Sequence, residues 1–569
     1  MGNAAGVLED TKDEVNRAFF STTVKAIHHF KEVFDKPAAS DSYVAKLDPF
    51  TKFWLMITQA AVDPTRRPGA EKVRNIHKKQ LLPMHNCSLG DESDLILQFT
   101  DIDEHDGEQD DGLGDIVGAA LFLASEKLHL NEKSSEDATY FPSIEEGKAV
   151  GEAEFGKILP GTEIEWTEFS SDEALTRLAF HSMGQIYLTN FRNKEKAVKG
   201  GVEGTAVYEI DLSFMFNYSV REHFEKYGCV VYFDREKKPL GIYWHAGNKF
   251  VKPGDEDWNH AKFVARSTLM CVVTVKDHLV NVHWIISNQL VHATRQCLSP
   301  DHPLRRLLRC HTHQSSRVNW ASKQTLLPIG ALAYRFFAID EKSWNTVLSD
   351  SFKLYQYETF GSFLESKQLP EEVMKALPMY QDGMGLWDVI KQYVTSYLTI
   401  FFPDDASVQN DVELKTYWAQ FEPRPMWIDC ALPPLSRESL IEQVTHSIFW
   451  VTGGHELVGQ IVEFFKDPSG VVGKIRPGKE EADVESFFLS LLLIALTGFH
   501  QPMLMSDWTH LHKYEGLAED KQNRVFASLE GFQSNLKELV TRIDKDNNTT
   551  RPYKFMALNP RTLECSVSL

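Results

Sequence analysis

The chain has 569 residues, of which 43% are hydrophobic and 25% are charged, and its formal net charge is −20. This length and apolar content are sufficient for a large buried core and exclude a globally disordered chain. The excess of acidic side chains disfavours nucleic acid and anionic membrane surfaces, so we expect no nucleic-acid binding and at most transient contact with a membrane.

The first 150 residues carry helix-type stretches separated by polar and proline-containing turns. We expect residues 1–150 to form a helical and loop region packed on a larger body. The acidic stretch Asp101–Asp115 has the composition of a calcium-binding loop. However, His105 and Asp106 stand where such a loop needs Asp or Asn and then Gly. A solvated acidic loop is therefore the favoured interpretation.

Short β-type runs occur between residues 205 and 245. They are rich in β-branched and aromatic side chains and are bounded by turn residues, which predicts a small antiparallel sheet. The runs are Thr205–Asp211, Cys229–Phe233 and Pro239–Trp244. From Trp258 onward helical periodicity dominates, so the sequence predicts a mainly α protein with a small inserted sheet.

Two histidines, His278 and His283, are separated by four residues in a helix-type stretch. On a regular α-helix their side chains would diverge by about 140°, so they could not readily share one ion. A local π-turn would return them to one face, and such turns often mark functional sites. Taken alone, the spacing favours two structural histidines over a metal site.

Two further segments supply candidate donors. His455 lies on a second helix-type stretch, and the chain ends with the carboxylate of Leu569. Three imidazoles and one carboxylate form a mixed nitrogen and oxygen donor set, which suits non-haem iron, with manganese as an alternative. The candidate donors are thus His278, His283, His455 and the carboxylate of Leu569, and the family resemblance described next implies these four as the metal ligands.

Several motifs, in order over roughly residues 175 to 569, resemble those of the lipoxygenase family. The interval from Ala261 to His278 matches the family's interval to its first metal histidine, and His283 then falls on the second. Ordered motifs are far more specific than any single one. The segments are Tyr208–Leu212, Lys226–Gly228, Trp258–Lys262, Ala293–Leu298, His302–His311, Asp382–Ile390, Val408–Leu414 and Ser566–Leu569.

The resemblance implies a large helical body around a long central helix, with residues 151–569 as the catalytic domain. The amino-terminal β-sandwich of plant and animal members is not recognisable, which matches the family's core-only members. The implied activity is that of a dioxygenase that uses non-haem iron, or manganese, to convert polyunsaturated fatty acids and O2 to lipid hydroperoxides. Gly330 or Ala331 falls near the position where the family places a small residue that controls the oxygenation face.

One position departs from the family pattern. The family's third histidine is followed four residues later by Asn, His or Ser as a weak ligand, whereas this chain has Gly459 there or lacks the residue. Glycine has no side chain that could coordinate. Two alternatives therefore stay open, namely an iron enzyme that rearranges lipid hydroperoxides and a catalytically silent lipid-binding homologue.

The seven cysteines are scattered and form no CxxC pair. Nothing in their spacing indicates a disulfide framework or a zinc site, which favours reduced thiols. We expect a cytoplasmic monomer whose partners are a polyunsaturated fatty acid and O2.

Overall fold

The computed structural model describes most of the chain from residue 168 onward. The gaps within this part are residues 300, 313–314, 316–318, 320–326, 328–331, 422–431, 460–469, 471, 481–485, 487–503, 507 and 568–569. The expectations for residues 1–150, including the acidic stretch Asp101–Asp115, lie outside the described residues, so the proposed division into two regions stays a prediction.

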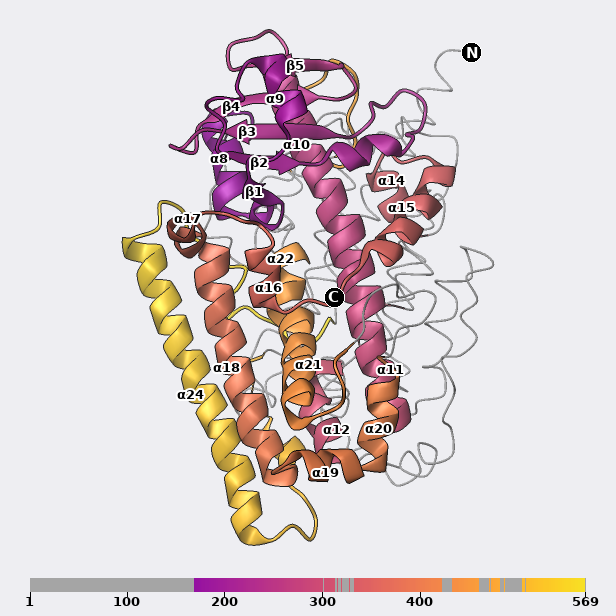
Figure 1. The fold of residues 1–569 in the computed structure, drawn as a ribbon, viewed down its shortest axis with the longest axis vertical. Coiled ribbons are helices and arrows are strands. Elements are labelled where there is room, and N and C mark those ends of the chain that lie inside the picture. Colours follow the sequence, from indigo (N-terminus) through magenta and orange to yellow (C-terminus); the bar gives the residue numbers. More distant parts are fainter. Residues whose placement is uncertain are drawn as a thin grey trace, which may run out of the picture.

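An antiparallel sheet of five strands lies at one end of the described part, with the strands in the order β1-β2-β3-β4-β5 (Figure 1). The expected sheet is confirmed, and it is extended at each edge by a strand of three residues. Helix α10 (Trp258–Val272) packs on the sheet through β3 and β4, and helix α9 (Lys194–Gly200) packs through β4 and β5. All five residues of β3 are buried as a result. The strands are β1 (Leu188–Asn190), β2 (Tyr208–Asp211), β3 (Cys229–Phe233), β4 (Pro239–Trp244) and β5 (Lys249–Val251).

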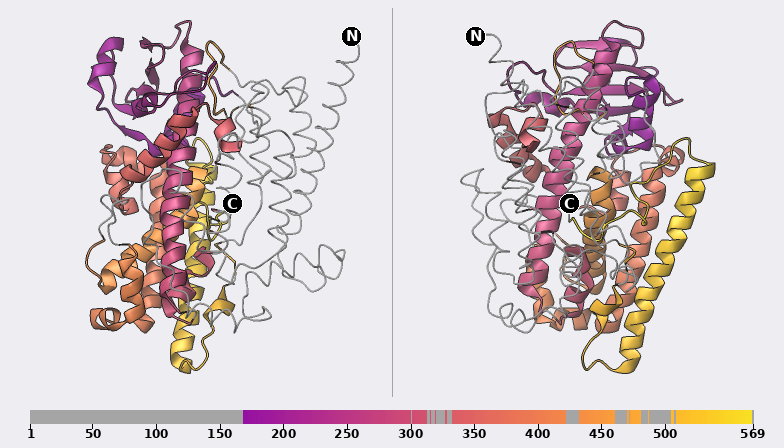
Figure 2. Two further views of the ribbon diagram at one scale, coloured as in Figure 1. Left: turned by 90° about the vertical axis from the view of Figure 1, so that its right-hand side faces the viewer. Right: turned by 180° about the vertical axis from the view of Figure 1, so that it is seen from behind.

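One long central helix runs from the sheet through the helical body, as Figure 2 shows from two further sides. It consists of α10 (Trp258–Val272), a π-helical segment Val273–Ser287 and α11 (Asn288–Cys297). By length and composition alone this helix could cross a membrane, but 83% of its most apolar window is buried inside the protein. A helix that is apolar all round is buried by neighbouring elements in the core of a large domain.

The helices around it form the body. Helix α18 (Pro378–Phe401) packs along both α24 (Glu519–Thr549) and α21 (Arg437–Phe449), while α15 and α22 pack on the π-helical segment. The mainly helical fold with a small antiparallel sheet is therefore confirmed. The remaining α-helices are α8 (Asp172–His181), α9 (Lys194–Gly200), α12 (Pro303–Leu308), α14 (Leu332–Phe336), α15 (Glu341–Leu354), α16 (Phe360–Glu365), α17 (Glu371–Ala376), α19 (Asp405–Asn410), α20 (Val412–Ala419) and α22 (His455–Gly459). Short 3₁₀ helices span Met183–Ile186, Ser213–Asn217, Cys310–Thr312 and Thr509–His512.

Candidate metal centre

The first two candidate ligands lie on the π-helical segment of the central helix. His278 and His283 are five positions apart, and the wider turn of Val273–Ser287 brings their Nε2 atoms to 3.2 Å from each other. A regular α-helix would direct the two rings about 140° apart. The π-turn that the spacing required is therefore confirmed, and it is the local feature that lets both rings face one point.

The third candidate ligand, His455, is the first residue of α22. It follows α21 and a second π-helical turn, Trp450–Gly454. Its Nε2 lies 2.9 Å from Nε2 of His278 and 3.2 Å from Nε2 of His283. Gly453, two residues before His455, allows this turn to pack closely on α18, because a Cβ there would lie 2.4 Å from a methyl carbon of Leu386.

The three rings form a triangle of nitrogens with edges of 2.9, 3.2 and 3.2 Å. Two ligands at right angles, each bonded to an ion at about 2.1 Å, lie about 3 Å apart. The separations therefore fit three adjacent positions on one ion. These histidines form one of the two groups with metal-binding geometry found among the described residues, and His283 and His455 are buried.

The contacts within this triangle cannot all be hydrogen bonds. Each Nε2 lies close to both of the others, and a ring nitrogen that carries a proton has no lone pair left with which to accept one. At least one of the three contacts therefore sets two lone pairs or two protons against each other. A bound cation would remove this repulsion, so the donor set fits a metal ion.

Burial holds the rings in the neutral form that binds metals. The pKa of His278 lies well below its ordinary value, chiefly because the ring is buried and secondly because His283 and His455 are close. Burial, and then the neighbouring His455, lowers the pKa of His283 to about 3. At neutral pH a metal therefore has no proton to displace from these two imidazoles.

Asn319 orients the second ring. Its Oδ1 accepts a hydrogen bond of 2.8 Å from Nδ1 of His283, while its Nδ2 donates to the backbone oxygen of His283 and to Oδ1 of Asn288. The two donated bonds identify Nδ2 of Asn319 as the amide nitrogen, so the amide atom that faces the His283 ring is Oδ1. Because this oxygen can only accept a hydrogen bond, Nδ1 of His283 must carry the proton. The lone pair of His283 is then on Nε2, which faces the other two histidines.

Asn319 was not predicted from the sequence. It lies 36 residues beyond His283, and no spacing rule connects an isolated asparagine to a histidine on another segment. The only available signal was chemical, since metal-binding histidines commonly donate their second ring N–H to an oxygen acceptor.

The other edge of His455 faces carboxylates. Oε1 of Glu456 lies 3.7 Å from Nδ1 of His455, and the carboxylate of Glu564 belongs to the same group. Glu456 approaches the ring nitrogen that points away from the triangle, so its carboxylate does not replace an imidazole there.

Three predicted site residues lie outside the described part of the chain. They are Leu569, Gly330 and Ala331, so the terminal ligand and the small residue at the oxygenation face stay predictions. Val567, two residues before Leu569, is fully buried.

Gly459, the residue that departs from the expected pattern, ends α22 directly beside His278. A Cβ at this position would lie 3.0 Å from Nε2 of His278 and 3.4 Å from each of the two ring carbons that flank this nitrogen. A side chain at position 459 would therefore lie over the nitrogen end of the His278 ring.

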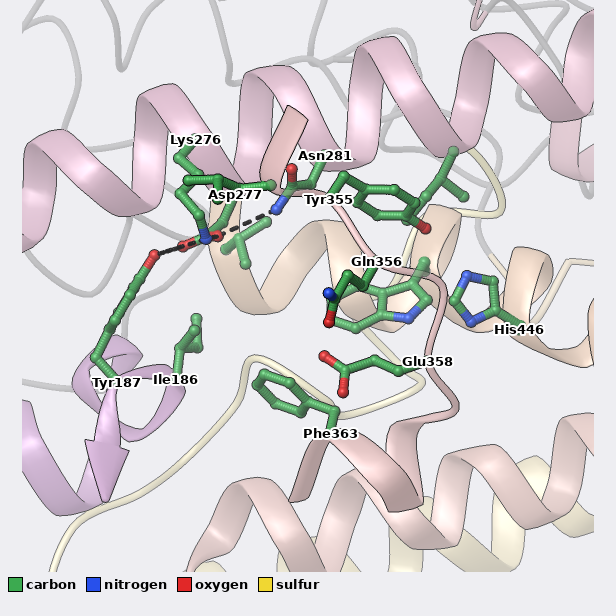
Figure 3. Close-up of a pocket in the computed structure, with 14 residues that line it drawn as sticks. Ile186, Tyr187, Lys276, Asp277, Asn281, Tyr355, Gln356, Glu358, Phe363 and His446 are labelled. Carbon is green, nitrogen blue, oxygen red and sulfur yellow. Dashed lines mark hydrogen bonds and ion pairs between the residues drawn. The ribbon is translucent and has the colours of Figure 1, made fainter. Parts of the chain in front are cut away.

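A pocket of about 190 Å³, drawn in Figure 3, is lined by residues that include sequence neighbours of the site. Its lining includes Asp277 and Val458, the chain neighbours of His278 and Gly459. Asp277 accepts hydrogen bonds from Tyr187 at 2.7 Å and from Lys276 at 2.9 Å, so the positive charge of Lys276 is balanced. The rest of the lining consists of Ile186, Asn281, Ile286, Leu354, Tyr355, Gln356, Glu358, Phe363, His446 and Trp450.

The protein thus combines a mainly helical body with a buried site of three histidines, two of which lie on the π-helical segment of the central helix. Residues 248–459, which include all three histidines, match the family model described as Lipoxygenase. The resemblance to lipoxygenases that the sequence motifs indicated is thus confirmed over this part of the chain.

The curated proteins to which the chain is similar include lipoxygenases of plants and animals. The chain is 25% identical over 340 residues to lipoxygenase 2, chloroplastic, of Arabidopsis thaliana, covering 51% of this chain and 36% of that protein. It is 26% identical over 349 residues to the polyunsaturated fatty acid lipoxygenase ALOX8 of Mus musculus, covering 57% of this chain and 50% of that protein. The matches thus span half or less of the length of these two relatives.

Solved structures share the fold. The manganese lipoxygenase of Gaeumannomyces graminis aligns with a TM-score of 0.60 at 17% identity, over 80% of this chain and 92% of that chain. A calcium-dependent 11R-lipoxygenase aligns with a TM-score of 0.57 at 17% identity, over 79% of this chain and 72% of that chain. At these identities the similarity establishes the fold alone.

Proposed function

We propose that this chain is a lipoxygenase-type dioxygenase that converts a polyunsaturated fatty acid and O2 to a lipid hydroperoxide. The observation that supports it is the convergence of Nε2 of His278, His283 and His455 within 2.9–3.2 Å in a buried site. The similar proteins support the substrate class, since one is a polyunsaturated fatty acid lipoxygenase and one solved structure is a lipoxygenase in complex with arachidonate.

The proposed roles of the residues follow from their positions. The three imidazoles would hold iron, with manganese as the alternative, and Asn319 keeps the lone pair of His283 directed at the ion. When bound, the metal supplies the one-electron chemistry that removes a hydrogen atom from the methylene between two double bonds. The overall reaction breaks one C–H bond, forms one C–O bond and leaves the hydrogen on the peroxide, so no further co-reactant is consumed.

The experiment uses the full chain. Metal analysis is expected to find near-stoichiometric iron or manganese, and linoleate or arachidonate should then cause O2 uptake together with conjugated-diene absorbance. His455→Ala should lose both metal and O2 uptake. A metal-loaded chain that consumes no O2 with either fatty acid contradicts the proposal. A chain that binds no metal supports the silent lipid-binding alternative.

The carboxylate of Leu569 is the proposed fourth donor, and it has a test of its own. One glycine added after Leu569 moves the carboxylate along the chain without altering any internal side chain. We expect a lower metal affinity and loss of O2 uptake, whereas a chain with the amino-terminal Met1 extended in the same way should be unaffected. Normal metal binding by the carboxy-terminally extended chain would remove Leu569 from the ligand set.

A further inference from the structure

The pocket drawn in Figure 3 is separate from the triangle of nitrogens, since none of the three histidines of the candidate metal centre lines it. Its volume is about 190 Å³. This space holds about six water molecules at roughly 30 Å³ each. Pockets for drug-sized ligands begin at about 300 Å³, so an occupant of this pocket has to be a small molecule.

The positive charge of Lys276, at one end of the pocket, is already compensated. Its Nζ donates to Oδ1 of Asp277 at 2.9 Å and to the hydroxyl of Tyr187 at 3.2 Å. Oδ2 of Asp277 accepts a further hydrogen bond of 2.7 Å from Tyr187. The charges of Lys276 and Asp277 therefore offset each other, and this end of the pocket needs no charged ligand.

A second lysine, Lys367, contacts two residues of the pocket wall. It is buried, and its Nζ donates to the backbone oxygen of Ile186 and lies 4.1 Å from the centroid of the Phe363 ring. Burial lowers the pKa of Lys367 to about 7, so this lysine is only partly charged at neutral pH. Neither lysine forms an ion pair with Glu358, the remaining carboxylate of the lining.

Three polar groups of the lining lack a hydrogen-bond partner among the described residues. The carboxylate of Glu358 is half-buried and makes no hydrogen bond. Oδ1 of Asn281 is buried and unpartnered, because this amide donates from its other end to Asp277 at 3.3 Å. His446 is 3% exposed, and neither ring nitrogen makes a hydrogen bond of ordinary geometry, although the ring lies close to the backbone of Glu358.

Each of these three groups can accept a hydrogen bond, the imidazole through its unprotonated nitrogen. Buried acceptors without a donor are costly, so the pocket is suited to an occupant rich in N–H or O–H groups. We infer that it binds a small organic ammonium ion that carries a second hydrogen-bond donor, such as a short amino alcohol. The ammonium group would pair with Glu358, and the second donor would serve His446 or Asn281.

Aromatic side chains in the lining favour a cation over water alone. Tyr355, Phe363 and Trp450 all line the pocket, and the faces of aromatic rings attract cations. In Figure 3 the carboxylate of Glu358 lies between Phe363 and Gln356. Water would satisfy the acceptors there without neutralising this carboxylate, whereas an ammonium group does both.

The first test compares three ligands of equal length on the full chain by saturation-transfer NMR, namely ethanolamine, ethylene glycol and glycolate. We expect ethanolamine to bind at least about tenfold more tightly than the neutral glycol, because its hydrogen bond to Glu358 is charge-assisted. Glycolate should not bind, since Glu358 repels it. Equal affinities for ethanolamine and ethylene glycol overturn the inference, and so does tighter binding of glycolate.

The second test locates the site with two matched substitutions. Glu358→Gln keeps the size of the side chain and should bring the ratio of the two affinities to near one. Glu365→Gln removes an exposed carboxylate from α16 and should leave the ratio unchanged. This control is needed because a chain with a net charge of −20 attracts ammonium ions over its whole surface. Equal losses in the two variants mean surface attraction only and overturn the inference.

The third test examines the second donor. Ethylammonium lacks the hydroxyl group of ethanolamine and should bind several-fold more weakly to the wild type. His446→Phe and Asn281→Leu each remove one acceptor, and at least one of them should abolish this difference. If Glu358→Gln does not fold, the selectivity of the wild type and these two variants still decide. Equal binding of ethylammonium and ethanolamine by the wild type overturns the two-donor ligand.

This inference goes beyond the proposed function and does not depend on it. Its measurements require no bound metal, no fatty acid and no O2 uptake. A chain that oxygenates linoleate but does not prefer ethanolamine overturns only the ammonium site. A chain that prefers ethanolamine but binds no metal overturns only the dioxygenase proposal.

Discussion

His283 donates its Nδ1–H to Oδ1 of Asn319 across 2.8 Å, and this bond determines which nitrogen of the ring can bind a metal. Both side chains are buried, so water does not compete for the bond. The asparagine is held in turn by its own bonds to the backbone of His283 and to Asn288. The orientation of the His283 ring toward the other two histidines therefore depends on Asn319, which is not itself a candidate ligand.

Replacing Asn319 by Ala should weaken metal binding without removing any ligand. We expect the affinity to fall by about 10–100-fold, the usual effect of losing a partner that orients a metal-bound histidine. Competition with a chelator measures it. Asn319→Asp keeps an oxygen acceptor and should retain most of the affinity, while Asn535→Ala on the exposed face of α24 should change nothing. An unchanged affinity in Asn319→Ala would show that packing alone orients His283.

Truncating an imidazole should have a larger effect than truncating Asn319. We expect His283→Ala to reduce bound metal from near one equivalent to near zero, because two imidazoles provide too few bonds to retain the ion at the wild-type affinity. Added metal at 100 times its dissociation constant should stabilise the wild type by about 2.7 kcal/mol and should not stabilise the variant. Metal analysis and thermal unfolding with and without metal check both expectations.

The exposed His223 provides the control for this experiment. Its backbone has a positive φ of 71°, which asparagine tolerates better than alanine does, so His223→Asn is the suitable change. Metal content that falls equally in the control and in His283→Ala would mean that the loss does not report on the triangle of nitrogens.

The sequence predicted the parts of the site that a local pattern encodes. The spacing of His278 and His283 required a π-turn if both were to bind one ion, and the central helix has that turn. The second π-turn, before His455, was not predicted, because its glycines and tryptophan carry no periodic signal. Hydrogen bonds such as Tyr187 to Asp277, 90 residues apart, arise only from tertiary packing.

The strands of the sheet likewise divide into those that a local sequence pattern predicts and those that it does not. The three strands with continuous β-type residues were found in the sequence, whereas β1 and β5 have only three residues each and are too short to show alternation. These edge strands are defined by their pairing with β2 and β4 rather than by their own composition.

A buried ion pair ties α18 to the segment after α24. Arg551 donates from Nη1 and Nη2 to the two carboxylate oxygens of Asp382 at 2.8 and 2.7 Å. Asp382 is fully buried, and burial raises the pKa of its carboxyl group while Arg551 opposes that shift. The pair fixes the start of the segment that leads to the predicted ligand Leu569.

Asp382→Ala should therefore be strongly destabilising. It leaves the guanidinium of Arg551 without its carboxylate in a buried position, and we expect a loss of about 3–5 kcal/mol in the free energy of unfolding. Denaturant titration measures the loss. Asp388→Ala removes an exposed carboxylate from the same helix and should cost much less. Equal losses in the two variants would mean that the ion pair does not stabilise the protein.

Stability should also depend on pH through His446, which is buried and packs against Tyr357 with ring centroids 4.3 Å apart and ring planes tilted by 44°. Burial lowers the pKa of His446 from 6.5 to about 3. Between these two values the unfolded chain binds a proton at this residue and the folded chain does not. The neutral, buried His446 therefore contributes fully to the free energy of unfolding above pH 6.5, and this contribution is lost progressively as the pH falls toward 3.

Between pH 7.5 and 5.5 this single residue should reduce the free energy of unfolding by about 1.4 kcal/mol, since the unfolded chain gains most of one proton over that range. His446→Phe keeps an aromatic ring against Tyr357 but cannot be protonated. Denaturant titrations of the metal-free wild type and variant at both pH values test this, because other titrating groups contribute equally to both proteins and cancel in the comparison. If the variant loses as much stability as the wild type over this range, His446 already binds its proton in the folded protein, and the ring is less shielded from solvent than its burial indicates.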